Sequence, residues 1–228
     1  DLAALHFWAH PGVDLHLVTH PESLPEVRAI TGQEAVAVRG FNPRGFDDPP
    51  SRADARRALD LPADGAVVLV SGGGWGVGDV EGAVEEALAA GAAGVLVLCG
   101  TNEGLRARVA ERHVRDARVR PLGFTDRMPE LMAAADVLVH STAGLTVLEA
   151  AICGCRTISY GWGRGHIRVN NRAFAATGLA AVAPDRPALA AALRDALAHP
   201  RERDASWRDL PRAADVVIGF VARLQQTG

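Results

Sequence analysis

Hydrophobic and polar positions alternate along the chain with two different periods. Short runs of consecutive apolar residues, such as residues 66–70, predict buried strands because β-branched side chains favour extended backbone. After most of these runs, apolar residues recur three and four positions apart, which predicts amphipathic helices. We expect strands at residues 15–19, 35–39, 66–71, 94–99, 118–122, 137–140, 156–160 and 179–182. The expected helices cover residues 22–31, 52–59, 79–90, 103–112, 128–135, 145–153, 167–177 and 187–198.

This alternation predicts the fold class. Strands that are apolar throughout, each followed by a helix, form a parallel sheet with helices on both faces. We therefore expect an α/β fold with a doubly wound, Rossmann-like parallel sheet. Such sheets bind their ligands outside the carboxyl ends of the strands, so the loops that follow strands are the candidates for a functional site.

Residues 40–51 interrupt the pattern and are rich in turn-forming and helix-breaking residues, as is typical of a linker. We expect residues 1–43 to be the end of one domain with its linker, and residues 44–200 to form a second domain. Residues 201–228 hold a last helix. Its apolar stripe consists of Val216, Val217, Phe220, Val221 and Leu224. This helix either covers the sheet of the second domain or crosses to the first, and its polar face has too little positive charge for membrane attachment.

Composition narrows the classes of function. The chain has 228 residues, 48% of them hydrophobic, and a net charge of −3, so a sizeable core is expected and nucleic acid is an unsuitable partner. Apolar runs are too short for a membrane span. The start lacks a Met and a leader pattern, and we expect a piece of a longer protein. Three cysteines without metal-ligand spacing favour a reduced, cytoplasmic protein, and we expect no metal site.

Two strand–loop–helix segments are candidates for phosphate binding. The first follows the strand at 66–71 and contains Gly73, Gly74 and Gly76; the second, at residues 141–149, contains Gly144, Leu145 and Thr146. Small residues before a helix let backbone N–H groups and the positive helix end approach an anion. For the first segment, a tight turn without a ligand is the alternative.

Two further positions each allow two interpretations. Glu149 lies one turn into the second helix and suits the hydroxyls of a ribose, but Thr146-x-x-Glu149 also spells a capping box. Phe124 suits stacking near a base, or is a core residue in a turn whose helix is capped by Asp126.

Five motifs in fixed order carry a family resemblance. They are the glycine loop at 72–78, Cys99-Gly100-Thr101-Asn102, Gly123-Phe124-Thr125-Asp126, Gly144-Leu145-Thr146-x-x-Glu149, and Asn170. Their order resembles the nucleotide-sugar domain of the monogalactosyldiacylglycerol synthases, the processive diacylglycerol glucosyltransferases and the peptidoglycan GlcNAc transferases, the glycosyltransferase family 28 C-terminal domain. The resemblance implies the C-terminal half of a GT-B fold and a UDP-sugar as donor substrate, with no cofactor.

The resemblance implies roles for individual residues. Gly73, Gly74 and Gly76 would close over the donor diphosphate, and Gly144, Leu145 and Thr146 would bring a helix end to it. A second set of residues would contact the rest of the donor: Phe124 and Thr125 the uracil, Glu149 the ribose, Asn102 and His166 the donor site, and Arg44 the phosphates. His166 stands where relatives carry a sugar-contacting Gln, so the donor sugar is not implied.

The acceptor implied by the resemblance is a lipid or a polyprenyl chain, bound through a preceding domain that would also supply the catalytic base. No catalytic residue is assigned. A non-catalytic nucleotide-sugar-binding subunit of a split transferase and a UDP-GlcNAc 2-epimerase-like enzyme stay open as alternatives. Two locations are compatible with a lipid acceptor, the cytoplasm and the inner face of the plasma membrane.

Overall fold

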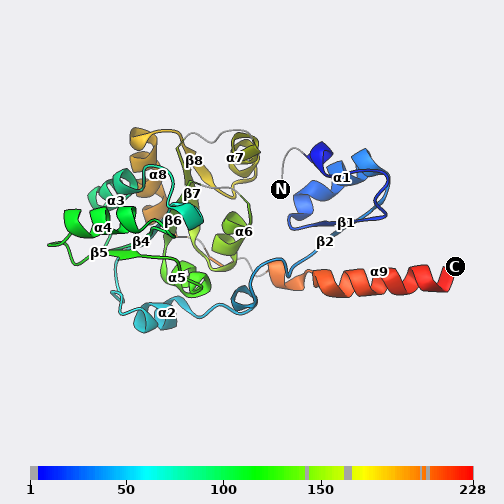
Figure 1. The fold of residues 1–228 in the computed structure, drawn as a ribbon, viewed down its shortest axis with the longest axis horizontal. Coiled ribbons are helices and arrows are strands. Elements are labelled where there is room, and N and C mark those ends of the chain that lie inside the picture. The colour runs from blue at the N-terminus through cyan, green and yellow to red at the C-terminus, as the bar shows by residue number, and fades with distance from the viewer. Residues whose placement is uncertain (1–4, 142–143, 162–165, 201, 204–205, 228) are drawn as a thin grey trace. The chain divides into compact units, whose positions relative to one another are not determined.

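The apolar runs of the sequence form two parallel sheets in the computed structural model of the chain, which describes residues 5–141, 144–161, 166–200, 202–203 and 206–227. These residues fall into two compact units (Figure 1). Unit 1 comprises the described residues of 1–48 and 205–228, and unit 2 comprises those of 49–204. The chain passes into unit 2 after Asp48, within the segment predicted as a linker.

The described part of unit 2 contains a six-stranded parallel sheet with the order β5-β4-β3-β6-β7-β8. The strands are β3 (Val67–Ser71), β4 (Gly94–Leu98), β5 (Val119–Leu122), β6 (Val137–His140), β7 (Arg156–Tyr160) and β8 (Ala181–Ala183). The chain starts in the middle with β3, moves outward to β5, and then returns to pair β6 with β3. The topological switch point therefore lies between β3 and β6, where Ser71 pairs with His140.

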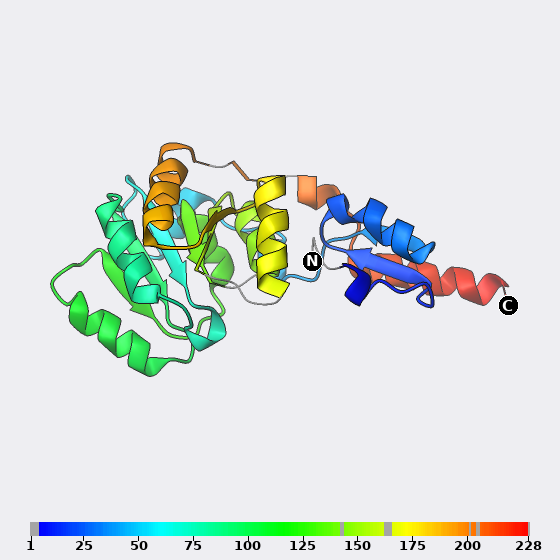
Figure 2. The same cartoon turned by 90° about the horizontal axis from the view of Figure 1, so that it is seen from above.

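Helices cover both faces of this sheet (Figures 1 and 2). On one face lie α3 (Val80–Ala89), α4 (Glu103–Arg112) and α8 (Arg186–Ala198), which share a core with alternate strand residues such as Val68 and Val139. The opposite side carries α2 (Arg52–Ala58), α5 (Met128–Ala134) and α6 (Leu145–Ile152), while α7 (His166–Thr177) packs beside β8. The predicted α/β, doubly wound parallel fold is confirmed.

Element boundaries differ from the prediction next to a proline at the start of the first α-helix and next to a glycine at the end of α7. The helix expected from residue 22 is a 3-10 turn (Pro21–Ser23) followed by α1 (Leu24–Thr31), because Pro25 has no N–H to bond the carbonyl of Pro21. The strand expected at 179–182 begins two residues later. The N–H of Leu179 instead donates to the Phe174 carbonyl at 2.9 Å, closing the end of α7 after the left-handed Gly178.

Unit 1 contains a two-stranded parallel sheet and the last helix. Strands β1 (Leu15–Val18) and β2 (Glu34–Ala37) are joined through α1, and α9 spans Ala213–Thr227. Arg39 ties β2 to the start of α9, because its Nε donates to the Leu210 carbonyl at 2.9 Å and its carbonyl accepts from Ala213 N at 2.8 Å.

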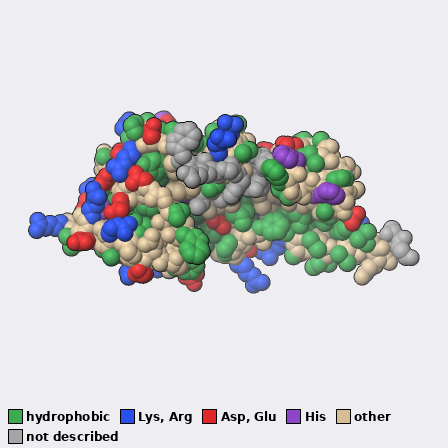
Figure 3. Space-filling model, turned by 45° about the horizontal axis from the view of Figure 1, so that its top comes forward, with side chains coloured by type: hydrophobic (Ala, Val, Ile, Leu, Met, Phe, Trp, Pro, Cys, Tyr) green, Lys and Arg blue, Asp and Glu red, His purple; other side chains and the backbone are tan. Residues whose placement is uncertain are grey.

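Much of the apolar stripe of α9 faces solvent, on the right of Figure 3 where hydrophobic side chains gather. Val221 is 46% exposed and Leu224 is 53% exposed. Within the described ranges, no helix has both the length and the apolar character that a bilayer crossing requires.

A half-buried carboxylate joins α2 to the amino ends of the central strands. Asp136 accepts a hydrogen bond from Val67 N and another from Arg56, both at 2.7 Å. Arg56 is 6% exposed and also donates to the carbonyls of Ala63 and Ala134. Both side chains are largely removed from water, so each charge is stabilised by the opposite charge of its partner and would be unfavourable without it.

We expect Asp136→Asn to lower the free energy of unfolding by about 3 kcal/mol, because it leaves the Arg56 guanidinium buried without its carboxylate. Chemical denaturation monitored by circular dichroism measures the loss. Asp64→Asn, an exposed carboxylate in the same unit, is the matched control and should be neutral. Equal stability of the two variants would show that Asp136 does not anchor α2.

Candidate functional site

A cleft opens at the carboxyl ends of β3, β4 and β5, next to the switch point of the sheet. Its volume is about 200 Å³, and it is open to solvent. The lining comprises Ser71, Gly73, Gly74, Leu98, Gly100, Gly123, Phe124, Thr125, Met128, Thr146 and Glu149. The walls are therefore the loops that follow three neighbouring parallel strands, together with the first turns of α6.

Six residues that the sequence analysis singled out meet in this cleft: Gly73, Gly74, Phe124, Thr125, Thr146 and Glu149. The alternative of Phe124 as a core residue is wrong, because its side chain is 76% exposed. Asp126 is not the cap of the following helix either. The N-cap of α5 is Arg127, whose N–H donates to Thr125 Oγ1 at 3.1 Å. This bond fixes the turn that carries Phe124.

Among the described residues, no side chain caps the amino end of α6. Its N-cap is Gly144, which has φ of 114° and no side chain to offer the first-turn N–H groups. Thr146 therefore lies inside the helix, and the capping box with Glu149 is wrong. Leu145 is the first residue of the helix and lies outside the cleft lining. The positive end of α6 is available to an anion, and Glu149, half-buried, follows one turn later.

The glycine loop after β3 is closed by its own hydrogen bonds. A 3-10 turn (Gly73–Trp75) follows the strand, and Val77 N donates to the Gly72 carbonyl at 2.8 Å. Thr101 N, from the loop after β4, donates to the Gly74 carbonyl at 2.9 Å. Gly73 and Gly74 line the cleft. Gly76, left-handed with φ of 59°, is pressed against the Cys99 carbonyl and does not line it.

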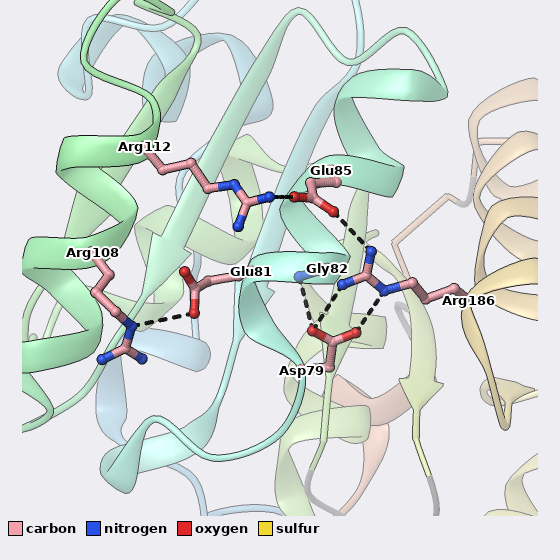
Figure 4. A network of polar contacts seen from close by, with 7 residues as sticks. All are labelled: Asp79, Glu81, Gly82, Glu85, Arg108, Arg112 and Arg186. Atoms are coloured by element: carbon pink, nitrogen blue, oxygen red, sulfur yellow. Dashed lines mark hydrogen bonds and ion pairs between the residues drawn. The ribbon is translucent and has the colours of Figure 1, made fainter.

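The helix after this loop is already capped by a carboxylate. Asp79 Oδ1 accepts from Gly82 N at 3.0 Å, which occupies the positive end of α3 where phosphate was expected. Figure 4 shows Asp79 paired with Arg186 at the start of α8, and Arg186 paired in turn with Glu85. The last residue of β7 joins this network, since Tyr160 Oη donates to Asp79 Oδ2 at 2.7 Å.

These contacts shift two pKa values. The hydrogen bond from Arg186 is the main cause that lowers the pKa of Asp79, with further contributions from Tyr160 and Gly82. Burial, followed by the bond to Asp79, raises the pKa of Tyr160 to about 12. At neutral pH Asp79 is therefore charged and Tyr160 is a hydrogen-bond donor.

Of three further predicted site residues, one lies away from the cleft and two are not placed against it. Asn102 caps α4, because its Oδ1 accepts from Leu105 N at 2.9 Å, and it is not part of the cleft lining. Arg44 is exposed in a 3-10 turn (Arg44–Phe46) of unit 1. His166 begins α7, and its side chain lies outside the described part of the structure.

Five cleft residues were not assigned to the site from the sequence: Ser71, Leu98, Gly100, Gly123 and Met128. Each lies within a few residues of a predicted strand end or helix start, and this position along the chain is the signal from which it could have been assigned to the cleft. The network of Asp79, Tyr160 and Arg186 was also missed. Its members come from three separate segments, and no spacing rule joins them.

Comparison with known proteins agrees with this geometry. Residues 77–199 match the family model of the glycosyl transferases group 1. The chain belongs to this family. It carries the C-terminal type of GT-B domain, distantly similar to monogalactosyldiacylglycerol synthases and processive diacylglycerol glucosyltransferases.

Two curated relatives and one solved structure illustrate the similarity. The chain is 25% identical to the processive diacylglycerol beta-glucosyltransferase of Bacillus licheniformis over 70% of its length and 43% of the relative. Identity to monogalactosyldiacylglycerol synthase 3 of Arabidopsis thaliana is 30%, over 68% of the chain and 36% of the relative. The crystal structure of MurG from Acinetobacter baumannii superposes with a TM-score of 0.56 at 17% identity, covering 92% of the chain and 60% of MurG. The chain thus spans less than half the length of these two relatives, and its fold is that of one half of a GT-B glycosyltransferase.

We expect Gly100→Ala to lower the free energy of unfolding by about 2 kcal/mol or more, since Gly100 has φ of 59° and an added Cβ would overlap the Gly74 carbonyl. Thermal and chemical denaturation measure the loss. Gly104→Ala is the control, because its Cβ would meet its nearest neighbour at 3.6 Å in a helix that favours alanine. A Gly100→Ala variant as stable as Gly104→Ala would disprove the close approach of the two loops.

Asp79→Asn keeps a capping side chain but removes the charge that Arg186 holds. We expect it to cost about 0.5–1 kcal/mol at about pH 7, since the pair is partly exposed. The pKa of Asp79 is lowered by folding, so this contribution is present above the unfolded pKa near 3.8 and is lost as pH falls through the lower folded pKa. Unfolding free energies measured across acid pH should converge for wild type and variant. Parallel curves would exclude the charge effect.

Proposed function

We propose that this chain is the donor-binding half of a UDP-sugar-dependent glycosyltransferase that acts on a lipid or polyprenyl acceptor. The observation that carries the proposal is the cleft at the switch point of the sheet, next to a helix end that no described side chain caps. Family membership restricts the reaction to sugar transfer. Doubly wound sheets place a nucleotide at this position.

Within the cleft, each wall suits one part of the donor. The amino end of α6, at Gly144, Leu145 and Thr146, would hold the diphosphate through backbone N–H groups and the helix dipole. Glu149 would accept hydrogen bonds from the ribose hydroxyls. Phe124 and Thr125 would lie beside the uracil, at the end of β5.

The glycine loop takes a different part in this proposal from the one that the resemblance implies. Gly73 and Gly74 would form the cleft floor next to the diphosphate, whereas Gly76 would set the loop's shape against the β4 loop. Because the α3 end is filled by Asp79, α6 supplies the helix dipole for the leaving diphosphate.

Donor binding would not depend on a divalent cation. Among the described residues that line the cleft, Glu149 is the one carboxylate. A magnesium ion at a phosphate is held by carboxylates, and in this proposal the ribose already occupies Glu149. The charge of the leaving nucleoside diphosphate would instead be stabilised by backbone N–H groups.

The acceptor would be bound together with protein that this chain does not contain. Two relatives are named as enzymes of diacylglycerol glycosylation, which supports a lipid acceptor. In this proposal residues 1–43 of unit 1 are the end of the acceptor domain with its linker, and α9 packs on that domain through its exposed stripe. The catalytic base would come from the same domain, and the enzyme would work at the cytoplasmic membrane surface.

Isothermal titration calorimetry of the chain with UDP, UDP-glucose, UDP-galactose and UDP-GlcNAc tests the proposal. Binding of UDP with an affinity that EDTA leaves unchanged supports it, and a preference among the sugars identifies the donor. A chain that is folded by circular dichroism and binds none of the four overturns it.

We expect Glu149→Ala to weaken UDP binding by about 1.5–3 kcal/mol, the contribution of hydrogen bonds to a charged group. The free energy of unfolding should change by less than about 1 kcal/mol, since the side chain is half-buried at the cleft. Calorimetry and denaturation measure the two quantities on the same samples. Glu111→Ala, on the exposed face of α4, is the control and should alter neither. A variant that loses stability but keeps its UDP affinity would give Glu149 a purely structural role.

A further inference from the structure

A second hollow lies at the same edge of the sheet as the donor cleft, beside β7, β8 and α7. Its volume is about 270 Å³. The lining comprises Gly161, Arg168, Asn171, Arg172, Ala175, Val182 and Pro184. None of these residues lines the donor cleft, so the two hollows are distinct.

The two arginines in this hollow are unusual for this molecule. Arg168 and Arg172 lie four positions apart, so both project from one face of α7. In the described part of the chain, the other arginines bond a carboxylate or a backbone carbonyl, with three exceptions. The exceptions are Arg44, Arg115 and Arg194. Arg168 and Arg172 are thus two adjacent cations for which the described residues supply no carboxylate.

The rest of the lining suits an oxyanion. No carboxylate belongs to its described lining. Asn171 is 5% exposed, and its Oδ1 accepts from Ser159 Oγ at 2.9 Å, so the NH₂ group of this amide is the part that remains to donate. Asp185, which follows Pro184, has its carboxylate engaged at the amino end of α8, where it accepts from Ala188 N at 2.9 Å.

The backbone around the hollow is fixed. Gly161 N donates to the Ala183 carbonyl at 2.8 Å, which holds the end of β7 to β8. Asn171 is held to β7 through Ser159. The hydrogen-bond donors of the hollow therefore belong to the sheet edge and to a helix. Donors on such elements favour a preorganised binding site over a chance grouping of mobile side chains.

We propose that this hollow binds a phosphate group, as a monoester or a diester, separate from the phosphates of the nucleotide-sugar. Two guanidinium groups on one helix face can each offer paired N–H donors to phosphate oxygens, and the amide of Asn171 adds a neutral donor. The phosphate has two possible sources with the same chemistry, a phospholipid headgroup and a free phosphate compound.

The test compares two double variants that lose the same charge. Arg168→Gln/Arg172→Gln removes the guanidinium groups of the hollow, and Arg115→Gln/Arg194→Gln removes two exposed arginines that line neither hollow. Amide resonances of the full chain are followed by NMR while inorganic phosphate is added at constant ionic strength. Gly161 and Asn171 report on the hollow, and Gly74 and Thr146 report on the donor cleft.

Sedimentation with vesicles of phosphatidylcholine, with and without phosphatidylglycerol, tests the lipid source. We expect wild type and control to bind alike in one or both assays, and the Arg168→Gln/Arg172→Gln affinity to fall at least about tenfold. Phosphate binding at Gly161 and Asn171 assigns a free phosphate compound, and binding to phosphatidylglycerol vesicles alone assigns a lipid headgroup. Equal loss in both double variants, or no binding in either assay by folded wild type, overturns the proposal.

Discussion

Parallel pairing of β3 with both β4 and β6 is the constraint on which the rest of unit 2 depends. Because all strands of this sheet run the same way, the loops after β3, β4 and β5 and the start of α6 meet at one edge. The sheet order reverses between β3 and β6, so the helices that follow them lie on opposite faces and leave an opening above the strand ends. The cleft is a consequence of this topology.

The two small-residue loops at this edge have different physical roles. The loop after β3 uses its glycines for close backbone contact, with Gly74 and Gly76 packed against the β4 loop at Gly100 and Cys99. The helix that follows this loop, α3, is capped at its amino end by the carboxylate of Asp79. The loop after β6 leads into a helix whose N-cap is a glycine. An anion would therefore be attracted to α6, and the first loop shapes the floor on which the ligand rests.

Some arginines of unit 2 form ion pairs within the protein, whereas others have no such pair among the described residues. Asp136 and Asp79 are each held by arginine, one at the amino ends of the strands and one behind the glycine loop. The Asp79 network reaches Tyr160, so a side-chain hydrogen bond joins the segment after β3 to the end of β7. Arg168 and Arg172, in contrast, face a hollow without a carboxylate. An arginine with no internal partner at the carboxyl edge of such a sheet is available for a ligand.

The sequence by itself determined the strands, most helices, the doubly wound class and six of the residues that meet in the cleft, because apolar periodicity and small residues after strands are local signals. Tertiary structure decided which alternatives hold: that Phe124 is exposed, that Thr146 lies inside α6, and that Asn102 caps α4. It also decided that Asp79 occupies the end of α3 and that Tyr160 and Arg186 converge on it. The contacts of Tyr160 and Arg186 with Asp79 span 81 and 107 residues, and such contacts arise from strand order, which no local pattern encodes.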